Sequence, residues 1–167
     1  GSWKLNLQDS GGNAVITDSR GVSPAGHATI VPKDDEAQED TFVVTWTGPA
    51  SLIVAGPPVD FQRETNGDLV MELRYRVLSV GKMPASISMG RGSDFRGALD
   101  MSKQFAEKAG AGWQTSQIKL SCFVAAGTRM ESITEPLVVT ADAGFALQMA
   151  SAKLVANPGK AGCGLSQ

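Results

Sequence analysis

Residues 69–80 constrain the fold more than any other part of the sequence, because their side chains alternate with a period of two. Such alternation is typical of a β-strand whose two faces meet different surroundings. One face carries Leu69, Met71, Leu73, Tyr75 and Val77, and the other carries Val70, Glu72, Arg74 and Arg76. We therefore predict a long strand whose first face points into a hydrophobic core.

Shorter alternating runs recur along the rest of the chain and are separated by turn residues. The composition of 19 glycines, eight prolines and 6% aromatic residues favours short strands joined by turns over helices. Besides 69–80, the expected strands are residues 3–8, 28–31, 42–47, 51–55, 59–64, 86–89, 114–121, 137–140 and 145–155. Asn66-Gly67 predicts a hairpin turn, residues 10–26 are expected to form turns, and residues 98–108 predict one short helix.

The length of 167 residues is that of one compact domain with its own core. We predict an all-β fold, either a sandwich or a barrel, over residues 3–156. Residues 1–2 are interpreted as the remnant of a cleaved tag, and the glycine-rich residues 157–167 as a flexible C-terminal tail.

Several classes of function lack their signature in this sequence. A net charge of -2 with both signs interspersed argues against a nucleic-acid partner, which requires clustered Lys and Arg. No apolar run approaches the roughly 20 residues that span a membrane. The single histidine, His27, has no Ser or Cys nucleophile motif nearby, and no spacing singles out a pair of carboxylates for glycoside hydrolysis. We therefore predict no catalytic residue and interpret His27 as a surface residue.

The side chains that could bind a metal ion form no recognisable motif in this sequence. The acidic run is Asp34, Asp35, Glu36, Glu39 and Asp40; it does not match the EF-hand pattern, and a solvated loop is favoured over a structural calcium ion. We expect no other cofactor. Two cysteines, Cys122 and Cys163, are too few for a zinc site, and whether they form a disulfide stays open at this point.

The polar face of the 69–80 strand is the strongest candidate for a binding site. Glu72, Arg74 and Arg76 offer fixed hydrogen-bond donors and acceptors to the hydroxyl groups of a sugar. Trp113 and Gln117 share one face of the 114–121 run and would extend this surface if the two strands are neighbours. The alternatives are a merely solvated face with cross-strand ion pairs, and a Trp113 that is buried under the helix.

Particular strings in the chain add a family resemblance to this pattern. They are Asp35 and Asp40 leading into Val44-Thr45-Trp46-Thr47-Gly48, then Leu73-Arg74-Tyr75-Arg76-Val77, Trp113-Gln114-Thr115 and Ile118-Lys119-Leu120-Ser121-Cys122-Phe123. In this order and spacing the chain resembles the C-terminal domain of bacterial family 3 glycoside hydrolases of the exo-1,3/1,4-β-glucanase type. The resemblance implies an antiparallel jelly-roll β-sandwich that is galactose-binding-domain-like, with one short helix.

The resemblance also implies a parent enzyme and a role within it. Such a parent removes glucose from β-glucan ends by a retaining mechanism, with its nucleophile and acid/base in earlier domains, so this domain itself is expected to be non-catalytic. The first hypothesis is a module that holds β-glucan oligosaccharide or polysaccharide near the parent's active site. The alternative is a structural domain that packs on the parent's catalytic domains and binds no sugar. Either role implies a bacterial protein exported to the periplasm or the medium.

Overall fold

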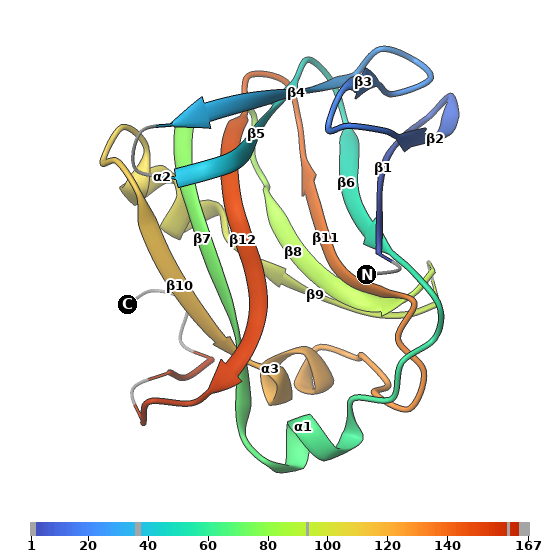
Figure 1. Ribbon diagram of the computed structural model, residues 1–167, viewed down its shortest axis with the longest axis vertical. Coiled ribbons are helices and arrows are strands. Elements are labelled where there is room, and N and C mark those ends of the chain that lie inside the picture. The colour runs from blue at the N-terminus through green and yellow to red at the C-terminus, as the bar shows by residue number, and fades with distance from the viewer. Residues whose placement is uncertain (1–2, 36–37, 93, 160, 164–167) are drawn as a thin grey trace.

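Two antiparallel sheets of six strands each face one another in the computed structural model (Figure 1). The structure describes residues 3–35, 38–92, 94–159 and 161–163. The strand orders are β2-β1-β6-β11-β8-β9 in the first sheet and β10-β7-β12-β5-β4-β3 in the second. The elements are β1 (Lys4–Asp9), β2 (Gly12–Ile16), β3 (Gly21–Val22), β4 (Ala28–Asp35), β5 (Gln38–Trp46), β6 (Ala50–Ala55), α1 (Gln62–Asn66), β7 (Leu69–Ser79), β8 (Ser86–Arg91), β9 (Asp94–Asp100), α2 (Ser102–Lys108), β10 (Gln114–Lys119), α3 (Leu120–Ala125), β11 (Glu135–Ala141) and β12 (Ala146–Ala156). The predicted all-β sandwich is confirmed.

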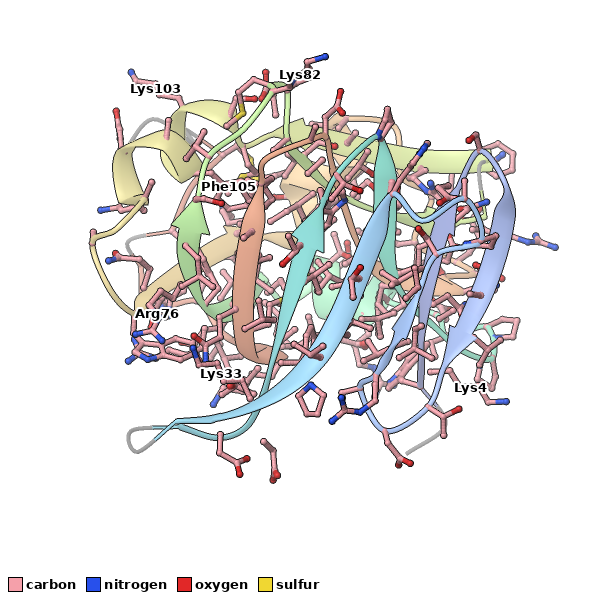
Figure 2. The ribbon with its side chains drawn as sticks, turned by 90° about the horizontal axis from the view of Figure 1, so that it is seen from above. Lys4, Lys33, Arg76, Lys82, Lys103 and Phe105 are labelled. Atoms are coloured by element: carbon pink, nitrogen blue, oxygen red, sulfur yellow. A yellow bond between two sulfur atoms is a disulfide. The ribbon has the colours of Figure 1, made fainter. Side chains whose placement is uncertain are left out.

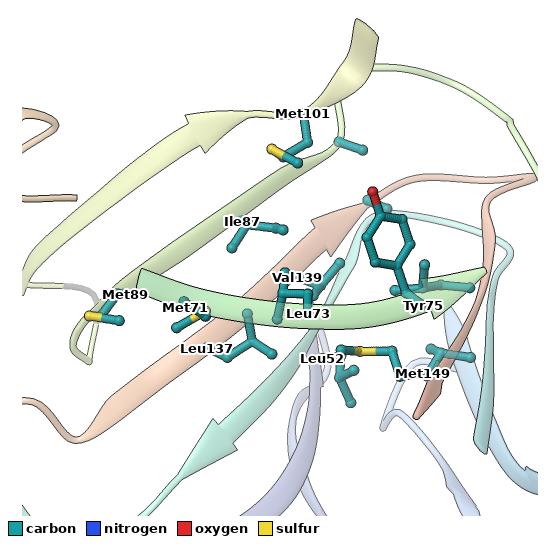
Figure 3. Packing of buried hydrophobic residues seen from close by; sticks show 14 of the residues in the cluster. Leu52, Met71, Leu73, Tyr75, Ile87, Met89, Met101, Leu137, Val139 and Met149 are labelled. Atoms are coloured by element: carbon teal, nitrogen blue, oxygen red, sulfur yellow. The ribbon is translucent and has the colours of Figure 1, made fainter. Parts of the chain in front are cut away.

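The core lies between the two sheets and is built from the inward face of each strand. In β7, Leu73, Tyr75 and Val77 are at most 2% exposed, as the alternation predicts. Figure 3 shows the β7 side chains opposite those of the first sheet, such as Ile87 and Val139. Each large apolar side chain buried in this way contributes about 1.5–3 kcal/mol to the stability of the fold.

The hairpin predicted at Asn66-Gly67 is wrong, and so is the strand predicted at residues 59–64. The chain instead forms α1, and the Gly67 N–H donates to the carbonyl of Arg63 at 2.8 Å, which ends the helix. Thr65 donates both its backbone N–H and its hydroxyl to the Phe61 carbonyl. Because Phe61 is buried against the core, this local helical turn is fixed by packing. β7 therefore pairs with β10 and β12 and not with the preceding segment.

Two further boundaries differ from expectation, and the described residues form three short helices in place of the single one predicted. Residues 98–100 belong to β9, because β9 pairs with β8 at the sheet edge, and the helix begins only at Ser102. The Asp100 carboxylate accepts the Ser102 N–H at 2.9 Å, which closes the turn between strand and helix. Residues 120–121, predicted as strand, begin α3, and the turn region 10–26 contains β2 and β3.

A disulfide joins Cys122 in α3 to Cys163, with the two Cα atoms 5.3 Å apart. The sequence left this pairing open, and the structure forms it. Asn157, just beyond β12, donates its side-chain amide to the Asp68 carboxylate at 2.9 Å. The described part of the C-terminal segment is thus bonded to the body of the sandwich at both of these points.

The described helices are all too short to cross a membrane. Among the described residues no group of three His, Cys, Asp or Glu side chains is placed to hold a metal ion. Of the acidic run considered for calcium, Glu36 and the side chains of Asp35 and Glu39 lie outside the described residues. The calcium alternative therefore stays a prediction.

Candidate functional site

The structure brings the candidate residues together on the outer face of the second sheet. β7 supplies Glu72, Arg74 and Arg76 from positions that alternate with its buried residues. β10 pairs with β7 so that Gln117 stands opposite Glu72, and Trp113 directly precedes this strand. We call Glu72, Arg74, Arg76, Trp113 and Gln117 the Arg–Trp surface. Figure 2 shows Arg76 on the side of the molecule away from Lys4 of the first sheet.

Around Glu72, the Arg–Trp surface is a row of polar side chains that runs across neighbouring strands. The Gln117 amide donates to the Glu72 carboxylate at 2.9 Å. From the other side, the Lys153 ammonium of β12 lies 3.6 Å from the same carboxylate. Glu72 is thus bonded from both neighbouring strands, and its side chain keeps 23% of its surface exposed. This carboxylate is a fixed acceptor on β7, the strand next to the sheet edge.

Around Trp113, the Arg–Trp surface consists of two guanidinium groups that contact the indole ring. The guanidinium carbons of Arg74 and Arg76 lie 5.6 and 5.1 Å from the ring centroid. Contacts of this kind are worth about 0.5–1 kcal/mol each at exposed sites. Arg74 also donates to the Thr115 hydroxyl at 3.2 Å. Trp113 is half-buried by its neighbours, so its indole does not stand alone as a bare stacking plane.

The indole N–H of Trp113 is buried and has no hydrogen-bond partner within the described part of the chain. An unpaired buried donor costs about 1–3 kcal/mol relative to a bonded one. Such a cost is tolerated where an ordered water molecule supplies the missing acceptor.

Arg76 is held in place by a buried amide that the sequence analysis did not single out. The Gln148 carbonyl oxygen accepts from Arg76 Nε at 3.2 Å and from Nη2 at 2.6 Å. The Gln148 amide nitrogen donates to the Thr41 hydroxyl at 2.9 Å, and Gln148 is fully buried. The signal in the sequence is one amide within the apolar run from Phe145 to Met149. A polar residue inside such a run needs buried partners.

Tyr75 lies directly under this surface and links its two strands. Its hydroxyl is 2.7 Å from the Ser116 hydroxyl of β10. Burial raises the pKa of the phenol above its usual value, and the hydrogen bond to Ser116 opposes this rise. The phenol therefore stays neutral at ordinary pH and has a structural role.

Two antiparallel sheets that pack face to face make this chain a β-sandwich domain, and its polar outer face carries a hydrogen-bonded set of side chains. The family model described as galactose-binding domain-like (Exop_C) matches residues 2–154. The chain belongs to this family. No curated protein sequence matches the chain significantly.

Solved structures show the same fold. The chain is similar to the extra C-terminal domain (X) of exo-1,3/1,4-β-glucanase (ExoP) from a Pseudoalteromonas species, with a TM-score of 0.79 and 18% identity over 96% of this chain and 89% of that one. In whole ExoP the TM-score is 0.75 and the identity 20%, over 95% of this chain and 19% of the enzyme. The expected resemblance to the C-terminal domain of an exo-β-glucanase is confirmed.

A third similar structure contains a bound sugar. It is the family 11 carbohydrate-binding module from Clostridium thermocellum in complex with a β-1,3-1,4-mixed-linked tetrasaccharide. The TM-score is 0.54 and the identity 14%, over 93% of this chain and 89% of the module. At this level of identity the likeness concerns the fold.

Proposed function

We propose that this chain is a non-catalytic carbohydrate-binding domain that holds β-glucan on the Arg–Trp surface. The observation that carries the proposal is the contact of Arg74 and Arg76 with the Trp113 ring. The hydrogen-bonded pair of Glu72 and Gln117 lies next to this contact on the same two strands. Guanidinium donors, a carboxylate acceptor and an amide then stand beside the indole ring of Trp113. Sugar hydroxyls both donate and accept, so they match this set of groups.

The named relatives support the choice of sugar. ExoP is described as an exo-1,3/1,4-β-glucanase, and the family 11 module binds a β-1,3-1,4-linked tetrasaccharide. We therefore propose β-glucan as the ligand, and a retaining glycoside hydrolase of family 3 as the parent enzyme. In this scheme the domain tethers a glucan chain, which raises its effective concentration at the catalytic domains of the parent. The proposed location is outside the cytoplasm, as the Cys122–Cys163 disulfide favours.

A second candidate function, packing against the catalytic domains without binding sugar, is favoured by a different region. Between the sheets lies an apolar hollow of about 290 Å³ that is lined by Trp3, Val54, Leu137 and Leu154, among others. Trp3, which lines this hollow, is 42% exposed. Exposed aromatic surface beside an apolar hollow is typical of a site that contacts another domain.

Isothermal titration calorimetry with cello- and laminari-oligosaccharides tests the proposed function. A shallow polar site exchanges water hydrogen bonds for sugar ones, so we expect a Kd near the millimolar range, about -4 kcal/mol. Arg74→Ala removes a charged donor and should weaken binding by about 1–3 kcal/mol. Arg76→Ala should act similarly, but it also leaves Gln148 with a buried acceptor, so its Tm must be checked.

Arg20→Ala is the matched control, because Arg20 is an exposed arginine next to β3 and outside the Arg–Trp surface. Its affinity should equal that of the wild type. If the wild type releases no heat with any of these sugars, or if Arg74→Ala binds as tightly as Arg20→Ala, the packing role replaces the binding role.

A further inference from the structure

Phe95 exposes an aromatic ring near the tip of the β8–β9 hairpin. The residue is 47% exposed, and its φ of 53° lies in the left-handed region that bulky side chains rarely adopt. The β8–β9 register shifts here, because Met89 pairs with Gly97 and Arg91 pairs with Asp94. Phe95 and Arg96 therefore share the single partner Gly90, which is a β-bulge. Bulges re-aim a side chain and are frequent next to functional sites.

Gly90 is required for this arrangement. A Cβ atom at residue 90 would lie 2.6 Å from the Arg96 Cα and 2.8 Å from the Phe95 carbonyl oxygen. These short contacts would be with backbone atoms, which cannot move aside without breaking the strand pairing. The bulge therefore requires glycine at residue 90. An exposed ring and a strained backbone at one residue both disfavour folding. Neither feature improves the packing of the sandwich, so a role in binding explains them better.

One face of the Phe95 ring is supported from behind. The guanidinium carbon of Arg129 lies 4.7 Å from the ring centroid, and Arg129 Nε is 3.1 Å from the Glu131 carboxylate. The carboxylate thus fixes the guanidinium, which in turn fixes the ring. The Phe95 residue keeps 47% of its surface exposed beside this contact.

A hollow of about 430 Å³ adjoins this stack, because Arg129 and Glu131 line it as well. Across the hollow, α1 presents Gln62 and Asn66, which are four residues apart and lie on one side of the helix. Both amides are exposed, and neither has a hydrogen-bond partner among the residues that the structure describes. Val124 of α3 also lines the hollow and is exposed.

We propose that Phe95 and this hollow form a second carbohydrate site, which takes a single pyranose unit of a glycan. The ring matches the C–H face of a pyranose, as aromatic planes do in sugar binding. Carboxylate, guanidinium and amide groups around it match neighbouring ring hydroxyls, each of which donates and accepts. The site lies on α1, α3 and the β8–β9 hairpin, away from the Arg–Trp surface, and does not depend on that surface binding anything.

The test is a titration of the isotope-labelled domain with methyl β-glucoside, cellotetraose and laminaritetraose, followed by nuclear magnetic resonance. We expect shifts of the Phe95 ring signals, the Arg129 Nε–H and the Gln62 and Asn66 amides below about 20 mM sugar. These resonances are separate from those of Arg74 and Gln117. A lack of sugar binding at one site can therefore be detected independently of binding at the other.

Phe95→Gly is the decisive variant. Glycine adopts a positive φ without strain, so Tm should stay equal or rise while the apparent Kd at this site weakens at least tenfold. Phe95→Trp should keep the affinity within about threefold, since it keeps an aromatic plane. Val15→Ala, at an exposed apolar residue on β2, is the matched control and should change nothing.

Two outcomes would overturn the proposal. One is the absence of any shift at Phe95, Arg129, Gln62 and Asn66 with all of these sugars. The other is a Phe95→Gly variant that binds like the wild type or that loses several degrees of Tm, because the ring would then be unnecessary for binding or needed for packing.

Discussion

At the scale of single residues, Asp9 shows how one side chain can close a loop. Its carboxylate accepts the backbone N–H groups of Gly11 and Ala25 at 2.9 and 3.0 Å, and that of His27 at 3.3 Å. Burial on its own would raise its pKa. Hydrogen bonds from the Ser23 hydroxyl and from these amides outweigh that effect and lower the pKa of Asp9 to about 2.

This pKa predicts an acid-dependent part of the stability. The folded value of about 2 is below the ordinary 3.8, so the stabilisation is fully present above pH 4 and is lost as the pH falls toward 2. Asp9→Asn should be less stable than the wild type at pH 7 and should show a smaller loss of Tm on acidification. Thermal unfolding between pH 7 and pH 2 measures both. Glu107→Gln, at an exposed residue of α2, is the control; equal acid dependence in wild type and Asp9→Asn would contradict this account.

The residues of the Arg–Trp surface also mark how far sequence can predict a site. Strict alternation puts Glu72, Arg74 and Arg76 on one face, since the period of a strand is fixed by its backbone. Gln148, which holds Arg76, comes from a strand 72 residues further along the chain. No local pattern encodes that pairing, because it depends on which strands become neighbours in the sheet.

At the scale of elements, local signals fail where tertiary contacts compete with them. Asn66-Gly67 is a strong hairpin signal by itself. Here Phe61 packs into the core and starts a helical turn, so the same dipeptide ends α1. β7 was predictable to within one residue because its apolar face alone specifies the strand. The short helices α1 and α3 were not, because a helix of one or two turns is stabilised by packing more than by propensity.

The disulfide is the element-scale feature with the largest expected effect on stability. It spans 41 residues, and closing a loop of that size in the unfolded chain stabilises the fold by about 2–4 kcal/mol. Cys163→Ser should therefore lower Tm by about 5–15 °C in thermal unfolding. Cys163 is the better of the two to change, because it is exposed whereas Cys122 is 2% exposed.

Wild-type protein in excess dithiothreitol supplies the control for this change. It should unfold at the temperature of the Cys163→Ser variant. A wild type whose Tm is insensitive to the reductant, under conditions that free both thiols, would show that the bridge contributes nothing.

At the scale of the whole molecule, three surfaces of different chemistry lie on separate parts of one sandwich. The Arg–Trp surface lies over β7 and β10 on the outer face of the second sheet. The apolar hollow near Trp3 lies between the sheets, and the hollow beside the Phe95–Arg129 contact is lined by residues of α1 and α3. None of these is an enclosed cleft with paired carboxylates. Such a division suits an accessory domain, which binds and positions while other domains react.

We expect the isolated domain to release no glucose. Incubation with laminarin or an aryl β-glucoside, followed by a glucose assay, should give the rate of the buffer alone. The physical reason is that hydrolysis needs an acid and a second carboxylate held about 5–10 Å apart across a bound sugar. A glucose-releasing activity that co-purifies with the folded domain, and that is lost when the domain is denatured, would contradict this prediction.

Binding of β-glucan to the Arg–Trp surface can be tested by a resonance titration of the isotope-labelled domain with a β-1,3-1,4-mixed-linked tetrasaccharide. We expect fast-exchange shifts at the Arg74 and Arg76 guanidinium groups, the Gln117 amide and the Trp113 indole N–H, with a Kd near the millimolar range. The indole signal should move with them, because both guanidinium groups lie against its ring. No movement of any of these signals at about 20 mM sugar, with the domain folded, would contradict the claim that the Arg–Trp surface binds β-glucan.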